Sequence, residues 1–63
     1  MKTQYVLHVY RAVSGQMSGR LFDGEEEVCG VAGCATVDEV RESIEKTGQR
    51  VDFVVDGVTG EGL

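Results

Sequence analysis

The segment TVDE, residues 36–39, constrains the fold more than any other part of this chain. It fits a capping box, in which the Thr36 hydroxyl accepts the amide proton three residues later and the glutamate carboxylate reaches back, so Thr36 is predicted to begin a helix. The stripe of apolar residues at helical spacing that follows comprises Val37, Val40 and Ile44. Gly48 supplies the left-handed stop. A helix of about eleven residues is too short to be stable alone, so it must dock on other elements.

Two segments before this helix alternate with the two-residue period of a β-strand. In Thr3–Val13, one side carries Tyr5, Leu7 and Val9, and the other carries Val6, His8 and Tyr10. In Met17–Phe22, the residues Met17, Gly19 and Leu21 alternate against Ser18, Arg20 and Phe22. The turn residues SGQ between the segments predict an antiparallel hairpin.

The first strand is apolar on both sides, which is typical of a central strand or of one whose second face a partner covers. Nothing else in this short chain is obviously able to cover Val6 and Tyr10. We therefore predict a homodimer with an interface at Val6, His8 and Tyr10.

The middle of the chain leaves two interpretations open. Asp23-Gly24 tolerates the positive φ angles of a type I′ turn, after which EEEVC is either a third strand or an acidic loop. The run CGVAGC holds two glycines, which weaken any regular element, and is expected to carry the chain from the sheet to the helix.

After the helix, Gln49–Asp56 is predicted to be a strand whose core-facing residues are Val51, Phe53 and Val55. The tail VTGEGL is either a short return strand or a frayed end. The predicted fold class is α+β: a small antiparallel sheet of three to four strands, in the order β-β-(β)-α-β, with one helix packed on one face. Residues 1–63 form a single domain in this interpretation, because a chain of this length has room for one core only.

Composition and charge narrow the class of partner. The formal net charge is −5, and residues 23–45 hold eight acids and a single base, for a local net of −7. Such a segment repels phosphate backbones, which disfavours nucleic acid as a direct partner, and attracts a basic protein surface. The residues predicted to bind that partner are Asp23, Glu25, Glu26, Glu27, Glu42 and Glu45.

No catalytic or cofactor motif stands in the sequence, so we expect no enzyme, no cofactor and no metal. The alternative is a metal-binding or redox-sensing module that uses Cys29, Cys34 and His8. The spacing of the cysteines matches neither a zinc-ligand pair nor a C-x-x-C redox motif. No apolar run approaches the roughly 20 residues of a membrane span, and the first ten residues lack a signal-peptide pattern, so a cytoplasmic protein is expected.

The segment VAGCATVDEV, residues 31–40, resembles the stretch before the helix of HicB-type antitoxins, where a strand runs through Gly-Cys into a helix. By its short length, acidity and α+β pattern the chain is also similar to phage-encoded inhibitors such as anti-CRISPR proteins. These resemblances imply a protein from a phage or mobile element. The predicted function is thus a small acidic, non-enzymatic interaction module that inhibits or regulates a basic nucleic-acid-binding protein.

Overall fold

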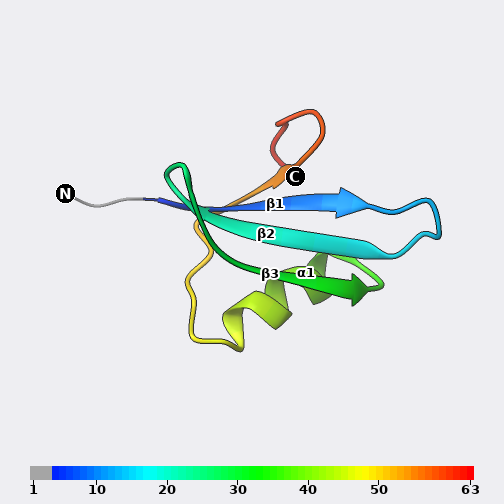
Figure 1. Cartoon of the computed structure of the whole chain (residues 1–63), viewed down its shortest axis with the longest axis horizontal. Helices are drawn as coiled ribbons and strands as arrows, with labels where there is room; N and C mark the ends of the chain where they lie inside the picture. Colours follow the sequence, from blue (N-terminus) through cyan, green and yellow to red (C-terminus); the bar gives the residue numbers. More distant parts are fainter. Residues whose placement is uncertain (1–3) are drawn as a thin grey trace.

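A computed structural model describes residues 4–63 and shows a sheet with one helix packed on one face (Figure 1). The elements are β1 (Tyr5–Arg11), β2 (Met17–Asp23), β3 (Glu26–Cys34), α1 (Val37–Glu45) and β4 (Phe53–Asp56). The strand order across the sheet is β3-β2-β1-β4. The predicted α+β class is confirmed. Thr3, where the first strand was predicted to begin, lies outside the described residues.

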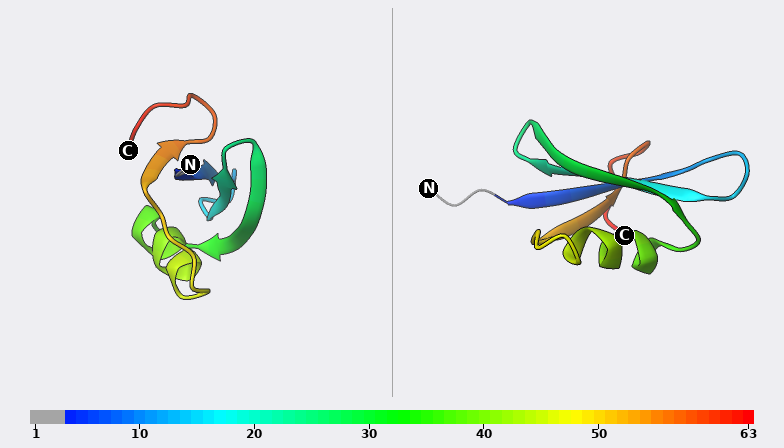
Figure 2. Two further views of the ribbon diagram at one scale, coloured as in Figure 1. Left: turned by 90° about the vertical axis from the view of Figure 1, so that its left-hand side faces the viewer. Right: turned by 60° about the horizontal axis from the view of Figure 1, so that its bottom comes forward.

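The direction of β4 differs from the sequence-based expectation. β1 pairs with β2, and β2 with β3, in antiparallel fashion, but β4 pairs with β1 in parallel, so the sheet is mixed. The cause is the helix: α1 runs back along the sheet and returns the chain to the end where β3 began, as the right view in Figure 2 shows. The next strand then starts from that end and runs in the same direction as β3 and β1.

The acidic segment after β2 is a strand rather than a loop. Asp23 pairs with Glu26, so the two turn residues are Gly24 and Glu25, one position later than predicted. Gly24 has a φ of 65° and no residue other than glycine has a positive φ in the described chain, which is the pattern of a type II′ turn rather than type I′. Strand β3 also continues through CGVAGC to Cys34 instead of leaving the sheet there. Two register shifts against β2 accommodate this run.

The helix begins where the sequence predicted. Thr36 is the N-cap, and its hydroxyl accepts the amide proton of Glu39 at 3.2 Å. Val40 and Ile44 are fully buried. The helix ends at Glu45 after nine residues, slightly earlier than expected, and Gly48 follows with a φ of 93°.

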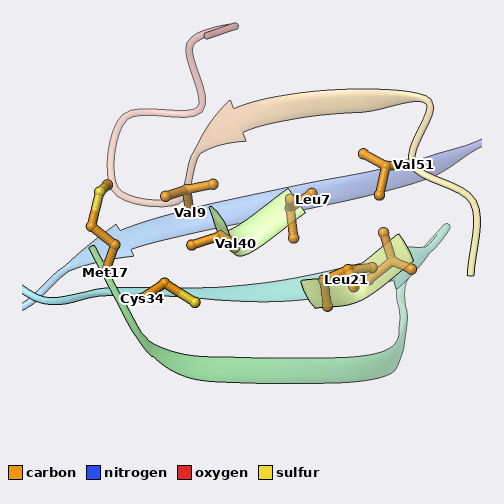
Figure 3. Close-up of a cluster of buried hydrophobic side chains, with 8 residues drawn as sticks. Leu7, Val9, Met17, Leu21, Cys34, Val40 and Val51 are labelled. Atoms are coloured by element: carbon orange, nitrogen blue, oxygen red, sulfur yellow. The ribbon is translucent and has the colours of Figure 1, made fainter. Parts of the chain in front are cut away.

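A single apolar cluster lies between the helix and the sheet (Figure 3). Its buried members are Leu7, Val9, Met17, Leu21, Cys34, Val40, Ile44 and Val51. The alternation predicted for β1 and β2 is confirmed, because the residues assigned to one side are those that contact α1. Gly19 lies in this layer, and a Cβ atom there would overlap Cγ1 of Val40. The helix therefore approaches the backbone of β2 closely at a position that only glycine permits.

The start of β4 shows why its two sides were assigned incorrectly. Asp52 donates its amide proton to the carbonyl of Tyr5, and its carboxylate accepts the Tyr5 amide proton, both at 2.9 Å. The Asp52 carboxylate thus takes the place of a backbone carbonyl in the pairing of this segment with β1. The regular strand begins only at Phe53. Val51 is buried as predicted, but Val54 packs against the core, so Phe53 and Val55 lie on the opposite face.

The tail returns along the outer edge of β4. Asp56 accepts the amide protons of Val58 and Thr59 through its carboxylate, which turns the chain. Val55 then forms an antiparallel bridge with Gly62, and Leu63 donates its amide proton to Val54 at 2.9 Å. The tail is therefore tied to β4 by an isolated bridge, which is neither a regular return strand nor a frayed end. In the described residues, no helix has the length and apolarity that crossing a membrane would require.

Candidate interaction surfaces

The acidic hairpin consists of Asp23, Glu25, Glu26 and Glu27 around the β2–β3 turn. The three glutamates are exposed, and Asp23 is half-buried. Because the turn holds only two residues, these carboxyl groups are crowded into one short projecting segment. The sequence therefore places four acids on one rigid corner of the sheet.

The hairpin carboxylates differ in their partners. Glu27 lies 3.3 Å from the guanidinium of Arg20, and both side chains are about half exposed. Such a pair contributes little to stability, because water screens it. Within the described chain, no hydrogen bond or ion pair engages the carboxylates of Asp23, Glu25 or Glu26, and the Oδ1 atom of Asp23 is buried without a partner. Most of the hairpin's negative charge is thus not neutralised by residues 4–63.

The two predicted helix residues lie elsewhere. Glu42 and Glu45 are exposed near the end of α1, and Glu45 pairs with Arg41 at 3.4 Å. In Figure 1 the β2–β3 turn lies above the strands and α1 below them, and the left view of Figure 2 shows the same separation. The structure therefore brings together the four hairpin acids but does not join them to Glu42 and Glu45.

The predicted dimer residues lie on the face of the sheet that α1 leaves free, here called the open face. It comprises Val6, His8 and Tyr10 of β1 with Phe22, Phe53 and Val55 beside them. Val6 pairs with Phe22 on one side and Phe53 on the other, which forms an apolar row across three strands. Phe53 is 50% exposed. Phe22 and Phe53 were not predicted as interface residues. The alternation of Phe22 with Met17, Gly19 and Leu21 was the signal that could have placed Phe22 on this face.

The ring of His8 packs edge-on against Phe22, with centroids 4.8 Å apart. No carboxylate or nucleophile is hydrogen-bonded to His8 in residues 4–63, so nothing there orients the imidazole for proton transfer. A Cβ atom on Gly57 would overlap the ring of Tyr10, so this ring covers the backbone beyond β4. His8 and Tyr10 are therefore both in contact with neighbouring groups of this chain.

The residues of the alternative metal or redox site are separated by the sheet. His8 is on the open face, whereas Cys34 is buried in the core, with its Sγ atom 3.9 Å from Ser43 Oγ. Cys29 packs against the same core, and both thiols are free. Across the part of the chain that is described, no three His, Cys, Asp or Glu residues are grouped so that they could hold a metal ion.

Two surfaces therefore remain as candidates for a function: the acidic hairpin, which is defined by charge, and the open face, which is defined by apolar side chains. Comparison of this chain with family models, with curated proteins and with solved structures gives no match.

Proposed function

We propose that this chain is a small, non-enzymatic interaction module that inhibits or regulates a basic nucleic-acid-binding protein through the acidic hairpin. The observation that carries the proposal is the set of hairpin carboxylates without a basic partner in the described chain. Carboxylates gathered around a two-residue turn resemble a short run of phosphates in charge. A protein surface that holds nucleic acid is complementary to them.

The test reverses the hairpin charge in the double variant Glu25→Lys, Glu26→Lys. Glu27 is left unchanged because it already pairs with Arg20. We expect the purified protein to capture a nucleic-acid-binding protein. Added salt should release the captured protein, and added double-stranded DNA should release it as well. The double variant should bind this protein at least about tenfold more weakly, because removing charge complementarity lowers the association rate.

The matched control is Glu42→Lys, Glu45→Lys, which makes the same change in net charge on the helix. This variant should retain binding, because Figure 1 shows α1 on the other side of the strands from the hairpin. Equal losses in the two variants would show that total charge recruits the partner. Capture that neither salt nor DNA reverses would contradict the proposal.

A second proposal concerns the open face: we propose that a second copy of the chain covers it. The supporting observation is the apolar row Phe22–Val6–Phe53, in which Phe53 is half exposed. Strands about 4.8 Å apart and roughly 20 Å long give a four-stranded sheet a face of about 400 Å² per copy, or about 800 Å² in total, which is below the range of stable specific interfaces. Only weak, transient association is therefore expected.

A further inference from the structure

The two edge strands of the sheet differ in their backbone hydrogen bonds. At the β4 edge, the tail residues Gly62 and Leu63 pair with the strand. At the β3 edge, no backbone hydrogen bond joins the strand to any described residue other than those of β2. β3 is also the longest strand, at nine residues. An unpaired edge of this length is a template for another strand.

The printed hydrogen bonds of the central strand show which backbone groups of β3 point outward. The carbonyls of Tyr5 and Val9 accept amide protons from Asp52 and Gly57, so the odd-numbered residues of β1 face β4. Backbone groups alternate along a strand, so the even-numbered residues of β1, including His8, face β2.

The backbone groups of β2 alternate in the same way between β1 and β3. Arg20, opposite His8, bonds to β1, so its neighbour Gly19 bonds to β3. Gly19 is paired with Val31, whose backbone groups therefore point into the sheet. The amide and carbonyl groups of Gly30, which lies between the paired residues Cys29 and Val31, consequently point away from the sheet. We infer the same outward direction for Ala32, which follows Val31 before the register returns at Cys34.

Nothing in the side chains of this edge blocks a new strand. Natural edge strands are commonly protected by lysine, proline, inward-pointing charge or β-bulges. Of these, β3 carries only the two register shifts against β2, which flank the regularly paired residues Cys29, Gly30 and Val31. Residues 28–34, VCGVAGC, contain no lysine, proline or charge, and Gly30, Ala32 and Gly33 are small and exposed. A hollow of about 430 Å³ on the open face is lined by Ser18, Arg20 and Gly30 among others, and it leaves room for a side chain of the added strand.

The charged residues of β3 indicate what kind of segment could pair with this edge. Glu26 and Glu27 begin β3, and Glu25 precedes them, whereas the rest of the strand is uncharged. Two β3 strands paired about Gly30 would set Glu26 against the uncharged Cys34, so a second copy offers these acids no cation. An extended segment with basic residues at one end is complementary to both the hydrogen-bonding edge and the acidic end.

We propose that β3 accepts, as an added antiparallel strand, an extended segment of a protein partner whose lysines or arginines lie in its C-terminal half. In that orientation the basic end reaches the acidic hairpin, while the backbone pairs with Gly30 and Ala32. The inference deepens the proposed function, on which it rests, by naming the structural form of the partner at the acidic hairpin.

The experiment uses a synthetic peptide as long as β3, nine residues, with alternating threonine and valine and with lysines only in its C-terminal half. The control peptide has the same sequence with N-methyl groups on alternate backbone amides, which keep the charge and remove the hydrogen bonds. We expect fluorescence anisotropy to show binding of the first peptide and at least about tenfold weaker binding of the second. Equal binding of the two peptides would overturn the inference.

Hydrogen exchange provides a residue-level readout on the same complex. In the free protein the amides of Gly30 and Ala32 should exchange faster than that of Val31, because only Val31 bonds within the sheet. The peptide should slow exchange at Gly30 and Ala32 and leave Val31 little changed. Peptide binding without new protection at these two amides would also contradict the added strand.

The variant Ala32→Pro removes one outward-facing amide, and Ala32→Thr is its control because threonine keeps the amide. We expect Ala32→Pro, but not Ala32→Thr, to lose the peptide while thermal unfolding shows that both remain folded. If the natural partner binds Ala32→Pro normally but not Glu25→Lys, Glu26→Lys, the added strand is wrong and the proposed function stands. If the partner tolerates both changes, both proposals fail.

Discussion

Strand β1 carries similar apolar residues on both of its sides, but the two sides differ in burial. Leu7 and Val6 are neighbours in β1, yet Leu7 has no exposed surface and Val6 is half-buried on the open face. The difference is α1, which covers one face only. Alternation along a strand thus determines which residues share a face, and the docking of another element determines which face becomes the core.

The largest effect expected from this comparison is in the substitution Leu7→Ala. Removing a fully buried leucine side chain costs about 2 to 5 kcal/mol, and a domain of this length has a total stability of roughly 3 to 9 kcal/mol. The variant should lose a large part of its stability, which urea denaturation followed by circular dichroism would show as a much lower midpoint.

Val6→Ala is the matched control for the open face. In dilute protein, where the chain is monomeric, its cost should stay below about 1 kcal/mol, because the valine is already partly in water. Similar losses for Val6→Ala and Leu7→Ala would show that something covers the open face even at low concentration.

Two glycines give an intermediate effect. Gly19→Ala places a methyl group against Val40 in the covered layer and should cost about 1 to 3 kcal/mol. The double variant Gly19→Ala, Val40→Ala should lose less free energy of unfolding than the two single variants lose together, by at least about 0.5 kcal/mol. The reason is that truncating Val40 removes the overlap with the new methyl group.

Gly57→Ala provides the comparison on the other face. The new methyl group overlaps the ring of Tyr10, which is half-buried and free to swing toward solvent. Its cost in urea denaturation should therefore be smaller than that of Gly19→Ala. The reverse order would mean that Tyr10 is held as rigidly as a core side chain.

The smallest effect on stability is expected at Phe53, and it tests the dimer. Phe53 and Val54 are adjacent in β4 but lie on opposite faces. Phe53→Ser should change the free energy of unfolding of the monomer by less than about 1 kcal/mol and abolish self-association in sedimentation experiments.

Val54→Ser should lower stability more, because Val54 packs against the core, and should leave the dimer intact. A wild-type protein that remains monomeric at high micromolar concentration would remove the dimer proposal, and a dimeric Phe53→Ser variant would exclude the open face as its interface.

The parts of the fold that local sequence determines were predictable. The cap at Thr36 and the alternation in β1 and β2 depend on residues a few positions apart, and the structure confirms them. The two sides of β4 were not predictable in this way, because the Asp52 carboxylate replaces a backbone partner of Tyr5 across 47 residues. The β2–β3 turn fell one residue later than predicted, since Gly24 with Glu25 satisfies a different turn type from Asp23 with Gly24.

The candidate site was predictable in its composition but not in its arrangement. The acids from Asp23 to Glu27 are adjacent in sequence and remain together on the hairpin. Glu42 and Glu45 were grouped with them by charge alone, and charge does not indicate on which side of the sheet a helix lies. Phe53 was assigned to the core because a regular strand was assumed through residue 52.

The parallel pairing of β1 with β4 also sets the order in which this chain can fold. The first three strands are joined by short turns, so their contacts are local and close quickly. Strand β4 reaches β1 only after the helix has spanned the sheet, and closure of that long loop must precede any gain from its hydrogen bonds. A chain emerging from the ribosome would therefore leave this side of β1 unpaired until β4 has been made. Kinetic φ-values near zero at Val54 would be the mark of that late step.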